Sequence, residues 1–192
     1  MKFLSRIAIL LLPLFSCNGG PDHLPGTDWH LGEKVLSPDL ADSLENTAVK
    51  DPSIVFFEGQ YHLFYSARSV YNKGDEPGYN ICCRYRSATT LAGLADAVPV
   101  TMDELAGCKV IAPQVFFFQP DSLWYLVAHT PSFEGRLDRL TPIYMTNRNI
   151  GNPLGWSEAR EIRTGKQDAG FRIDFWVICD EDNAHLFYAD QT

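Results

Sequence analysis

A stretch of aromatic sequence recurs three times in this chain, and this repeat constrains the fold more than any other feature. The first copy covers residues 51–65 (DPSIVFFEGQYHLFY), and a similar run covers residues 174–188 (DFWVICDEDNAHLFY), 123 positions later. A third copy, over residues 112–125 (APQVFFFQPDSLWY), lies halfway between them. The period is therefore about 61 residues, and we expect equivalent structural units in series.

Each copy has the pattern of a β-hairpin, with an apolar run, a short polar turn and a second aromatic run. The expected turns are residues 58–60, 119–122 and 180–183. Weaker strand patterns follow at residues 81–87 and 141–145, whereas helical periodicity is scarce and residues 101–105 form at most a turn. Two hairpins per period make a four-stranded unit, and such units arranged around an axis form a β-propeller. A β-sandwich is the alternative, but it does not explain why an aspartate starts two of the hairpins.

The period also predicts how much of a propeller is present. Residues 51–192 hold about 2.3 periods, whereas propellers close with about four to eight blades. We therefore expect an all-β chain in which residues 28–192 form the N-terminal part, about two to three blades, of a longer propeller domain.

The N-terminus is typical of an exported bacterial protein. Residues 1–16 have the basic start and short apolar core of a signal peptide. Leu14 and Ser16, placed before Cys17, resemble a lipoprotein processing box, in which Cys17 would be lipidated. Residues 17–27 would then form a flexible tether. The alternative is an ordinary signal peptide, so the protein is expected to be a cell-envelope lipoprotein or a secreted protein.

Charge and cysteine usage exclude several classes of function. The net charge is −8, without a Lys/Arg run among aromatic residues, which argues against nucleic acid or an anionic membrane surface as a partner. The membrane would be reached only through the lipid anchor.

Four cysteines remain after the signal peptide and Cys17: Cys82, Cys83, Cys108 and Cys179. They lack zinc-site spacing and are interpreted as structural, and three disulfide pairings are open. The sequence also lacks nucleotide, zinc-protease and serine-hydrolase motifs, so no cofactor is expected.

The repeat brings together residues that could carry chemistry. In a propeller, the innermost strands line a central channel, so Asp51, residues 112–114 and Asp174 would converge at its entrance. Two carboxylates among aromatic side chains suit acid–base chemistry on a neutral sugar. Lys50 would keep Asp51 ionised by lowering its pKa. The alternative is that the repeated aspartate only caps hairpin ends.

Several segments resemble glycoside hydrolase family 62, the α-L-arabinofuranosidases. Residues 29–38 (WHLGEKVLSP) and 50–64 (KDPSIVFFEGQYHLF) resemble the opening of that family. Similar segments follow in the family's order at residues 112–118 with 123–127, 152–159 (NPLGWSEA) and 174–180 (DFWVICD). The last of these runs is the most specific.

The resemblance implies a five-bladed propeller that releases α-L-arabinofuranosyl side groups from arabinoxylan or arabinan with inversion. By position, Asp51 would be the general base, and Asp174 would tune the pKa of the general acid and orient it. Lys50 and Gln114 would lie in the sugar pocket. The family's acid is a glutamate in a later blade, without a counterpart here, so little or no activity is expected of these 192 residues. A channel calcium ion would likewise take its histidine ligand from outside the chain.

The chain also departs from the family pattern. Residues 80–107 differ from the family's usual connection, and His129 stands where a glutamine is expected, so substrate preference stays open. His62 and His185 are interpreted as packing residues. Three alternatives remain: a non-catalytic carbohydrate-binding propeller, an inactive remnant, or a family 43-type furanosidase or xylosidase.

Overall fold

The computed structural model describes residues 31–73, 76–131, 140–163 and 171–191. The chain divides into a unit of residues 1–33 and a compact unit of residues 34–192, and the description below concerns the second. The expected signal peptide, Cys17 and the tether lie outside the described residues. Within the described ranges, no helix has the length and apolarity needed to cross a membrane.

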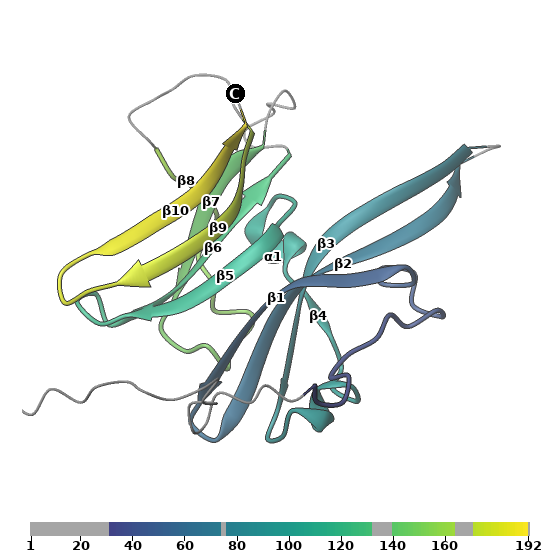
Figure 1. The fold of residues 1–192 in the computed structure, drawn as a ribbon, viewed down its shortest axis with the longest axis horizontal. Coiled ribbons are helices and arrows are strands. Elements are labelled where there is room, and N and C mark those ends of the chain that lie inside the picture. Colours follow the sequence, from purple (N-terminus) through teal and green to yellow (C-terminus); the bar gives the residue numbers. More distant parts are fainter. Residues whose placement is uncertain (1–30, 74–75, 132–139, 164–170, 192) are drawn as a thin grey trace, which may run out of the picture. The chain divides into compact units, whose positions relative to one another are not determined.

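The compact unit consists of three antiparallel β-sheets that follow one another along the chain (Figure 1). The first sheet contains β1 (Ala48–Phe57), β2 (Gln60–Lys73), β3 (Glu76–Ala88) and β4 (Val100–Thr101). The second contains β5 (Ile111–Phe118), β6 (Leu123–Thr130), β7 (Thr141–Asn147) and β8 (Arg160–Glu161). The third contains β9 (Phe171–Cys179) and β10 (Ala184–Gln191). Of the two short helical turns, η1 (Ala92–Leu94) lies between β3 and β4, and α1 (Asp103–Ala106) lies between the first and second sheets. The expected series of four-stranded units is thereby confirmed for two repeats.

The first hairpin shows why the repeat folds as expected. Glu58 and Gly59 form a two-residue turn with φ angles of 48° and 79°. Positive φ at both central positions matches the right-handed twist of the flanking strands. Glycine adopts such an angle without steric cost, so the short polar turn fixes the register of β1 against β2.

The main core lies between the first two sheets. Phe64 and Tyr85 of the first sheet form one buried cluster with Trp124, Leu126 and Ile143 of the second. Both faces of β2 are buried: Phe64 belongs to this cluster, whereas its neighbours Leu63 and Tyr65 belong to a second one, because successive side chains of a strand point to opposite faces. β1 lies beside β5 in this packing (Figure 1), and the Val115 amide donates a hydrogen bond of 2.9 Å to Ser53 Oγ. The packing therefore places the first strands of the two sheets next to each other.

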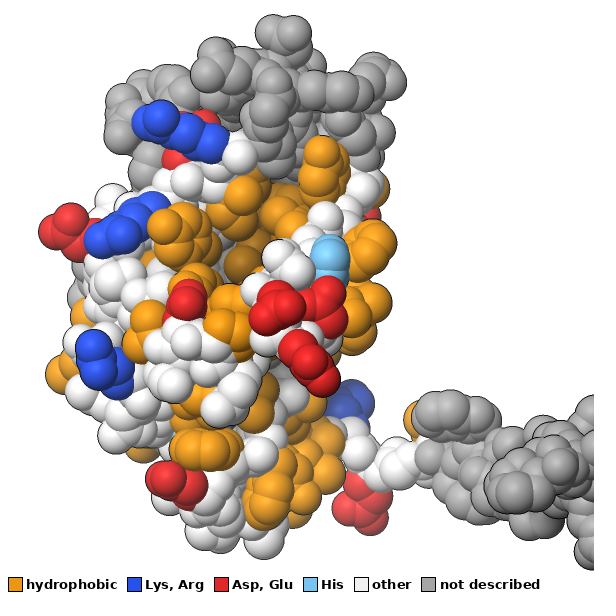
Figure 2. Space-filling model, turned by 90° about the vertical axis from the view of Figure 1, so that its left-hand side faces the viewer, with side chains coloured by type: hydrophobic (Ala, Val, Ile, Leu, Met, Phe, Trp, Pro, Cys, Tyr) orange, Lys and Arg blue, Asp and Glu red, His pale blue; other side chains and the backbone are white. Residues whose placement is uncertain are grey.

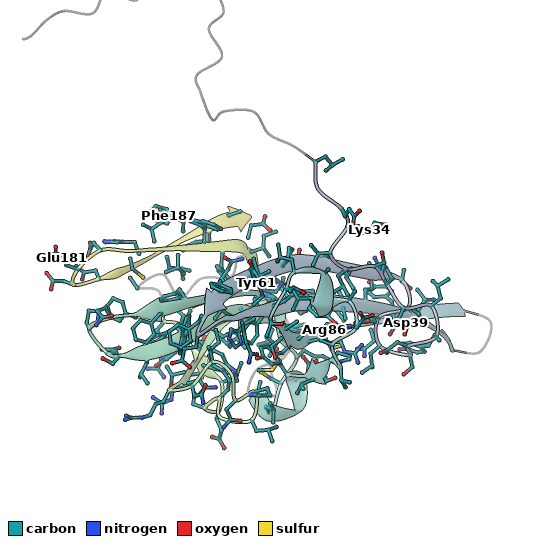
Figure 3. The ribbon with its side chains drawn as sticks, turned by 90° about the horizontal axis from the view of Figure 1, so that it is seen from below. Lys34, Asp39, Tyr61, Arg86, Glu181 and Phe187 are labelled. Atoms are coloured by element: carbon teal, nitrogen blue, oxygen red, sulfur yellow. The ribbon has the colours of Figure 1, made fainter. Side chains whose placement is uncertain are left out.

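The third hairpin has one buried and one exposed face. Phe175 is buried, and β9 contacts strands of the second sheet. Trp176, Ile178 and Phe187 are exposed, and Figure 3 shows Phe187 on the side of the hairpin that faces away from the other strands. Hydrophobic side chains are also exposed on the face of the molecule seen in Figure 2, next to a group of acidic ones.

The four cysteines of the described part are all free thiols. Cys82 and Cys83 are buried in the first sheet, which agrees with a structural role, whereas Cys179 is exposed on β9. Among the histidines, His62 packs as expected, with Nδ1 2.8 Å from the Tyr85 hydroxyl. The expectation for His185 is wrong, because this side chain is exposed and pairs with Asp180 at 2.6 Å.

Candidate active site

A β-bulge occurs at the same place in the first strand of each sheet. Opposite one residue of the neighbouring strand lie two residues: Asp51 and Pro52, Ala112 and Pro113, or Asp174 and Phe175. The first residue of each pair has a positive φ, of 52°, 52° and 57° respectively. This position of a bulge is usually taken by glycine. The three repeats thus share the same bulge conformation, and in two of them the first residue of the bulge is an aspartate.

These bulges correct the interpretation that the aspartates cap hairpin ends. Asp51 lies three residues inside β1, and Asp174 lies three residues inside β9. Proline lacks an amide proton and is tolerated within strands mainly at edges and bulges, which explains Pro52 and Pro113. A positive φ costs a non-glycine residue on the order of 1–3 kcal/mol, and such conformations cluster at functional sites.

Asp51 is ion-paired and only partly accessible. Lys50 Nζ lies 3.3 Å from Asp51 Oδ2. This oxygen is buried and has no hydrogen-bond partner among the residues that the structure describes, although 32% of the Asp51 side chain is exposed. The exposed part therefore belongs to the other side-chain atoms, which leaves Oδ1 as the oxygen able to meet a water molecule.

His129 occupies the middle of the candidate site. Its imidazole is 6% exposed and makes an edge-on contact with the Phe175 ring, with centroids 5.9 Å apart. Burial lowers the pKa of His129 to about 4, while the negative charges of Asp51 and Asp174 oppose this shift and the positive charge of Lys50 adds to it. These three predicted residues therefore lie near enough to act on the same buried imidazole through their charges.

Gln114 belongs to the same face of the second sheet as His129. Gln114 lies opposite Val127 on β6, and Ile111 lies opposite His129. Residues opposite each other in a ladder share a face, and Val127 and His129 are two positions apart, so they also share one. Gln114 is therefore on the face of the second sheet that carries His129, the residue on which the charges of Lys50, Asp51 and Asp174 act.

In the sequence, His129 stands out only as a departure from the family pattern, and the bulges have no local signature. The alignment of Asp51, Ala112 and Asp174 in the repeat was the signal available for them, since equivalent positions in repeats share backbone geometry. No three His, Cys, Asp or Glu side chains of the described ranges are placed to hold a metal ion. The expected calcium ion therefore stays a prediction, and no step proposed below passes through a metal.

The antiparallel units and the carboxylates at equivalent bulges define the class, a glycoside hydrolase of the β-propeller type. The family model described as glycosyl hydrolase family 62 matches residues 37–192, so the chain belongs to this family. This match favours family 62 over the family 43 alternative.

Individual relatives agree with this assignment. The chain is 29% identical over 144 residues to alpha-L-arabinofuranosidase C of Cellvibrio japonicus. The matched segment makes up 74% of this chain and 19% of that protein. The catalytic domain of a family 62 α-L-arabinofuranosidase from Coprinopsis cinerea is 31% identical, with a TM-score of 0.61, over 81% of this chain and 47% of that one. An α-L-arabinofuranosidase from Podospora anserina, solved with cellotriose, is 27% identical, with a TM-score of 0.60, over 81% and 48%. The chain thus spans about half the length of these solved relatives.

Proposed function

We propose that the chain carries the general-base side of an inverting α-L-arabinofuranosidase site that acts on arabinoxylan or arabinan. The observation that carries this proposal is Asp51, a partly accessible carboxylate that is ion-paired with Lys50 and grouped with Asp174 around His129. Similarity to α-L-arabinofuranosidases supports the choice of sugar.

In this mechanism Asp51 activates water. The Lys50 ammonium pairs with Oδ2, and Oδ1 accepts a proton from a water molecule. The water oxygen then attacks the anomeric carbon from the face opposite the leaving polysaccharide oxygen, which inverts the configuration. Base catalysis of this kind contributes a factor on the order of 100 to 10,000 to the rate.

The departing oxygen needs a proton from an acid on the opposite side of the glycosidic bond. We propose that a glutamate outside these 192 residues supplies it, and that Asp174 tunes the pKa of that acid and orients it. Without the acid, the chain alone is expected to release little or no sugar, because a factor on the order of 100 to 10,000 is lost.

The remaining residues would hold the substrate. Lys50 and Gln114 offer donors to sugar hydroxyls. A plant cell-wall polysaccharide is therefore the proposed partner. Export, with a lipid anchor at Cys17, stays a prediction that fits this substrate, and so does the absence of any required cofactor.

The reaction can be tested directly on wheat arabinoxylan. Protein expressed from the complete native reading frame should release arabinose whose first detectable anomer is β, observed by proton NMR before mutarotation. The 192-residue chain, assayed in parallel, should release little or none. Initial appearance of the α-anomer would contradict inversion, and equal activity of both proteins would contradict an acid outside the chain.

The alternative function is a non-catalytic carbohydrate-binding propeller or an inactive remnant, which would keep the same sugar-binding residues. Binding of arabinoxylan by the complete protein without any release of arabinose would favour that alternative.

A further inference from the structure

The second bulge differs from the other two in the side chain that it presents. The first residue of the bulge carries a carboxylate in Asp51 and Asp174, whereas in Ala112 it carries a methyl group. The φ of Ala112 is 52°, the same as that of Asp51. Alanine does not favour this conformation, because among non-glycine residues a positive φ is enriched in Asn, Asp and His and is otherwise uncommon. The fold therefore imposes this strained angle on Ala112 in the second sheet.

Ala112 also lies among the residues of the candidate site. Its amide donates a hydrogen bond of 2.9 Å to Ser66 Oγ, and Ser66 is opposite Lys50 in the ladder of β1 and β2. On the other side, the preceding residue, Ile111, is opposite His129. Ala112 thus connects the Lys50–Asp51 pair of the first sheet with the buried imidazole of the second.

We propose that Ala112 is a specificity-determining residue, whose short side chain leaves the space in which the pentofuranosyl ring lies. This inference rests on the proposed function. Because the three bulges have equivalent register and φ, a longer side chain at position 112 would extend as those of Asp51 and Asp174 do and would take up space beside them. A neutral five-membered sugar ring then fits because one of the three equivalent positions carries no functional group.

The test enlarges this side chain without disturbing the backbone. Asn tolerates a positive φ, and Ala112→Asn keeps the amide that bonds to Ser66. Ser122, in the turn between β5 and β6, has the same φ of 52° and is exposed, so Ser122→Asn is the matched control. Ala112→Ser provides a smaller enlargement in case the Ala112→Asn protein does not fold.

Binding of an arabinofuranosyl-substituted xylotriose is measured by calorimetry on protein from the complete reading frame, together with the melting temperature. We expect Ala112→Asn to melt like the wild type and to bind at least about tenfold more weakly. Ala112→Ser should bind with intermediate affinity, and Ser122→Asn should bind like the wild type.

The outcomes separate the two proposals. If a folded Ala112→Asn protein binds as tightly as the wild type, the role of Ala112 is refuted while the arabinofuranosidase proposal stands. The same holds if the Ala112→Asn protein is unfolded and the Ala112→Ser protein keeps full affinity. If the wild type itself does not bind the ligand, the proposed function fails, and the inference about Ala112 fails with it.

Discussion

At the scale of single residues, His129 is the clearest case of a side chain whose state is set by its surroundings. Its Nδ1 is buried without a hydrogen-bond partner in the described part of the chain. Burial disfavours the imidazolium, although two carboxylates lie close enough to favour it. The balance leaves the pKa of His129 at about 4, so its ring is neutral near pH 7.

A neutral buried histidine makes stability depend on pH. The pKa of His129 is about 4 in the folded protein and about 6.5 when unfolded, so the unfolded state binds more protons between these values. Stability should therefore be lost as the pH falls from about 6.5 to about 4, by about 3 kcal/mol from this residue. Urea unfolding of the wild type and His129→Gln across this range measures the contribution as the difference between the two curves.

Parallel stability curves for the two proteins would contradict this assignment. A direct check is the imidazole titration of His129 by NMR, which should have its midpoint well below that of an exposed histidine. His62, also buried and with a lowered pKa, contributes equally to both curves, so its effect cancels in the difference.

The repeat made it possible to predict from the sequence which residues belong to the site. It did not reveal their backbone conformation. Asp51 and Asp174 stood out because they occupy matching positions. Their positive φ angles, and that of Ala112, are imposed by the two-against-one register of neighbouring strands, which no local preference encodes. For the same reason the burial of His129 could not be predicted, since Phe175 covers it from a hairpin more than 40 positions later.

At the scale of elements, a buried ion-pair network fixes the segment before β1 to the first sheet. Glu45 is 0% exposed and accepts a hydrogen bond of 2.7 Å from the Tyr65 hydroxyl. Its two oxygens also pair with Arg84 at 2.9 Å and with Arg86 at 2.6 Å, both on β3. Arg86 donates further to backbone carbonyls of the segment that follows β3, including that of Ala97 at 2.8 Å. Glu45 and Arg86 together therefore connect the segment before β1 with the segment that follows β3.

Neutralising this glutamate should be costly. Glu45→Gln takes the carboxylate away from the buried Arg86 guanidinium, whereas Arg84 keeps its pair with Asp42 at 2.7 Å. Removal of one partner from a buried pair costs about 3–5 kcal/mol. Denaturant unfolding of the 192-residue chain measures the loss. Asp121→Asn, at an exposed turn residue that bonds to Tyr125, is the control, with an expected change below about 1 kcal/mol. A Glu45→Gln loss no larger than that of the control would show that the network does not hold the segment.

The hairpins were predictable as elements because aromatic strands and short polar turns are local signals. The two-residue strands β4 and β8 were not, since their pairing depends on partners in β3 and β7 rather than on their own pattern. The Glu45 network was missed for a related reason. Its four members are scattered over the sequence, and only the folded sheet brings them together.

At the scale of the whole molecule, apolar surface remains uncovered at both ends of the series of sheets. Ile54 and Phe56 are exposed on β1, and Trp176, Ile178 and Phe187 on the last hairpin, with Trp176 59% exposed. Strand faces of this kind normally pack against a further sheet. The exposed faces agree with a chain that spans about half the length of its solved relatives, and the count of 2.3 periods predicted the same extent.

The central claim is that Asp51 activates the water that attacks the sugar, and one substitution tests it most directly. Asp51→Asn, made in protein from the complete reading frame, keeps the shape of the side chain and its tolerance of positive φ, but it cannot accept the proton. We predict that arabinose release from wheat arabinoxylan falls by a factor on the order of 100 to 10,000, while the affinity for an arabinofuranosyl-substituted xylotriose is retained. Unchanged release by a folded Asp51→Asn protein would contradict the account.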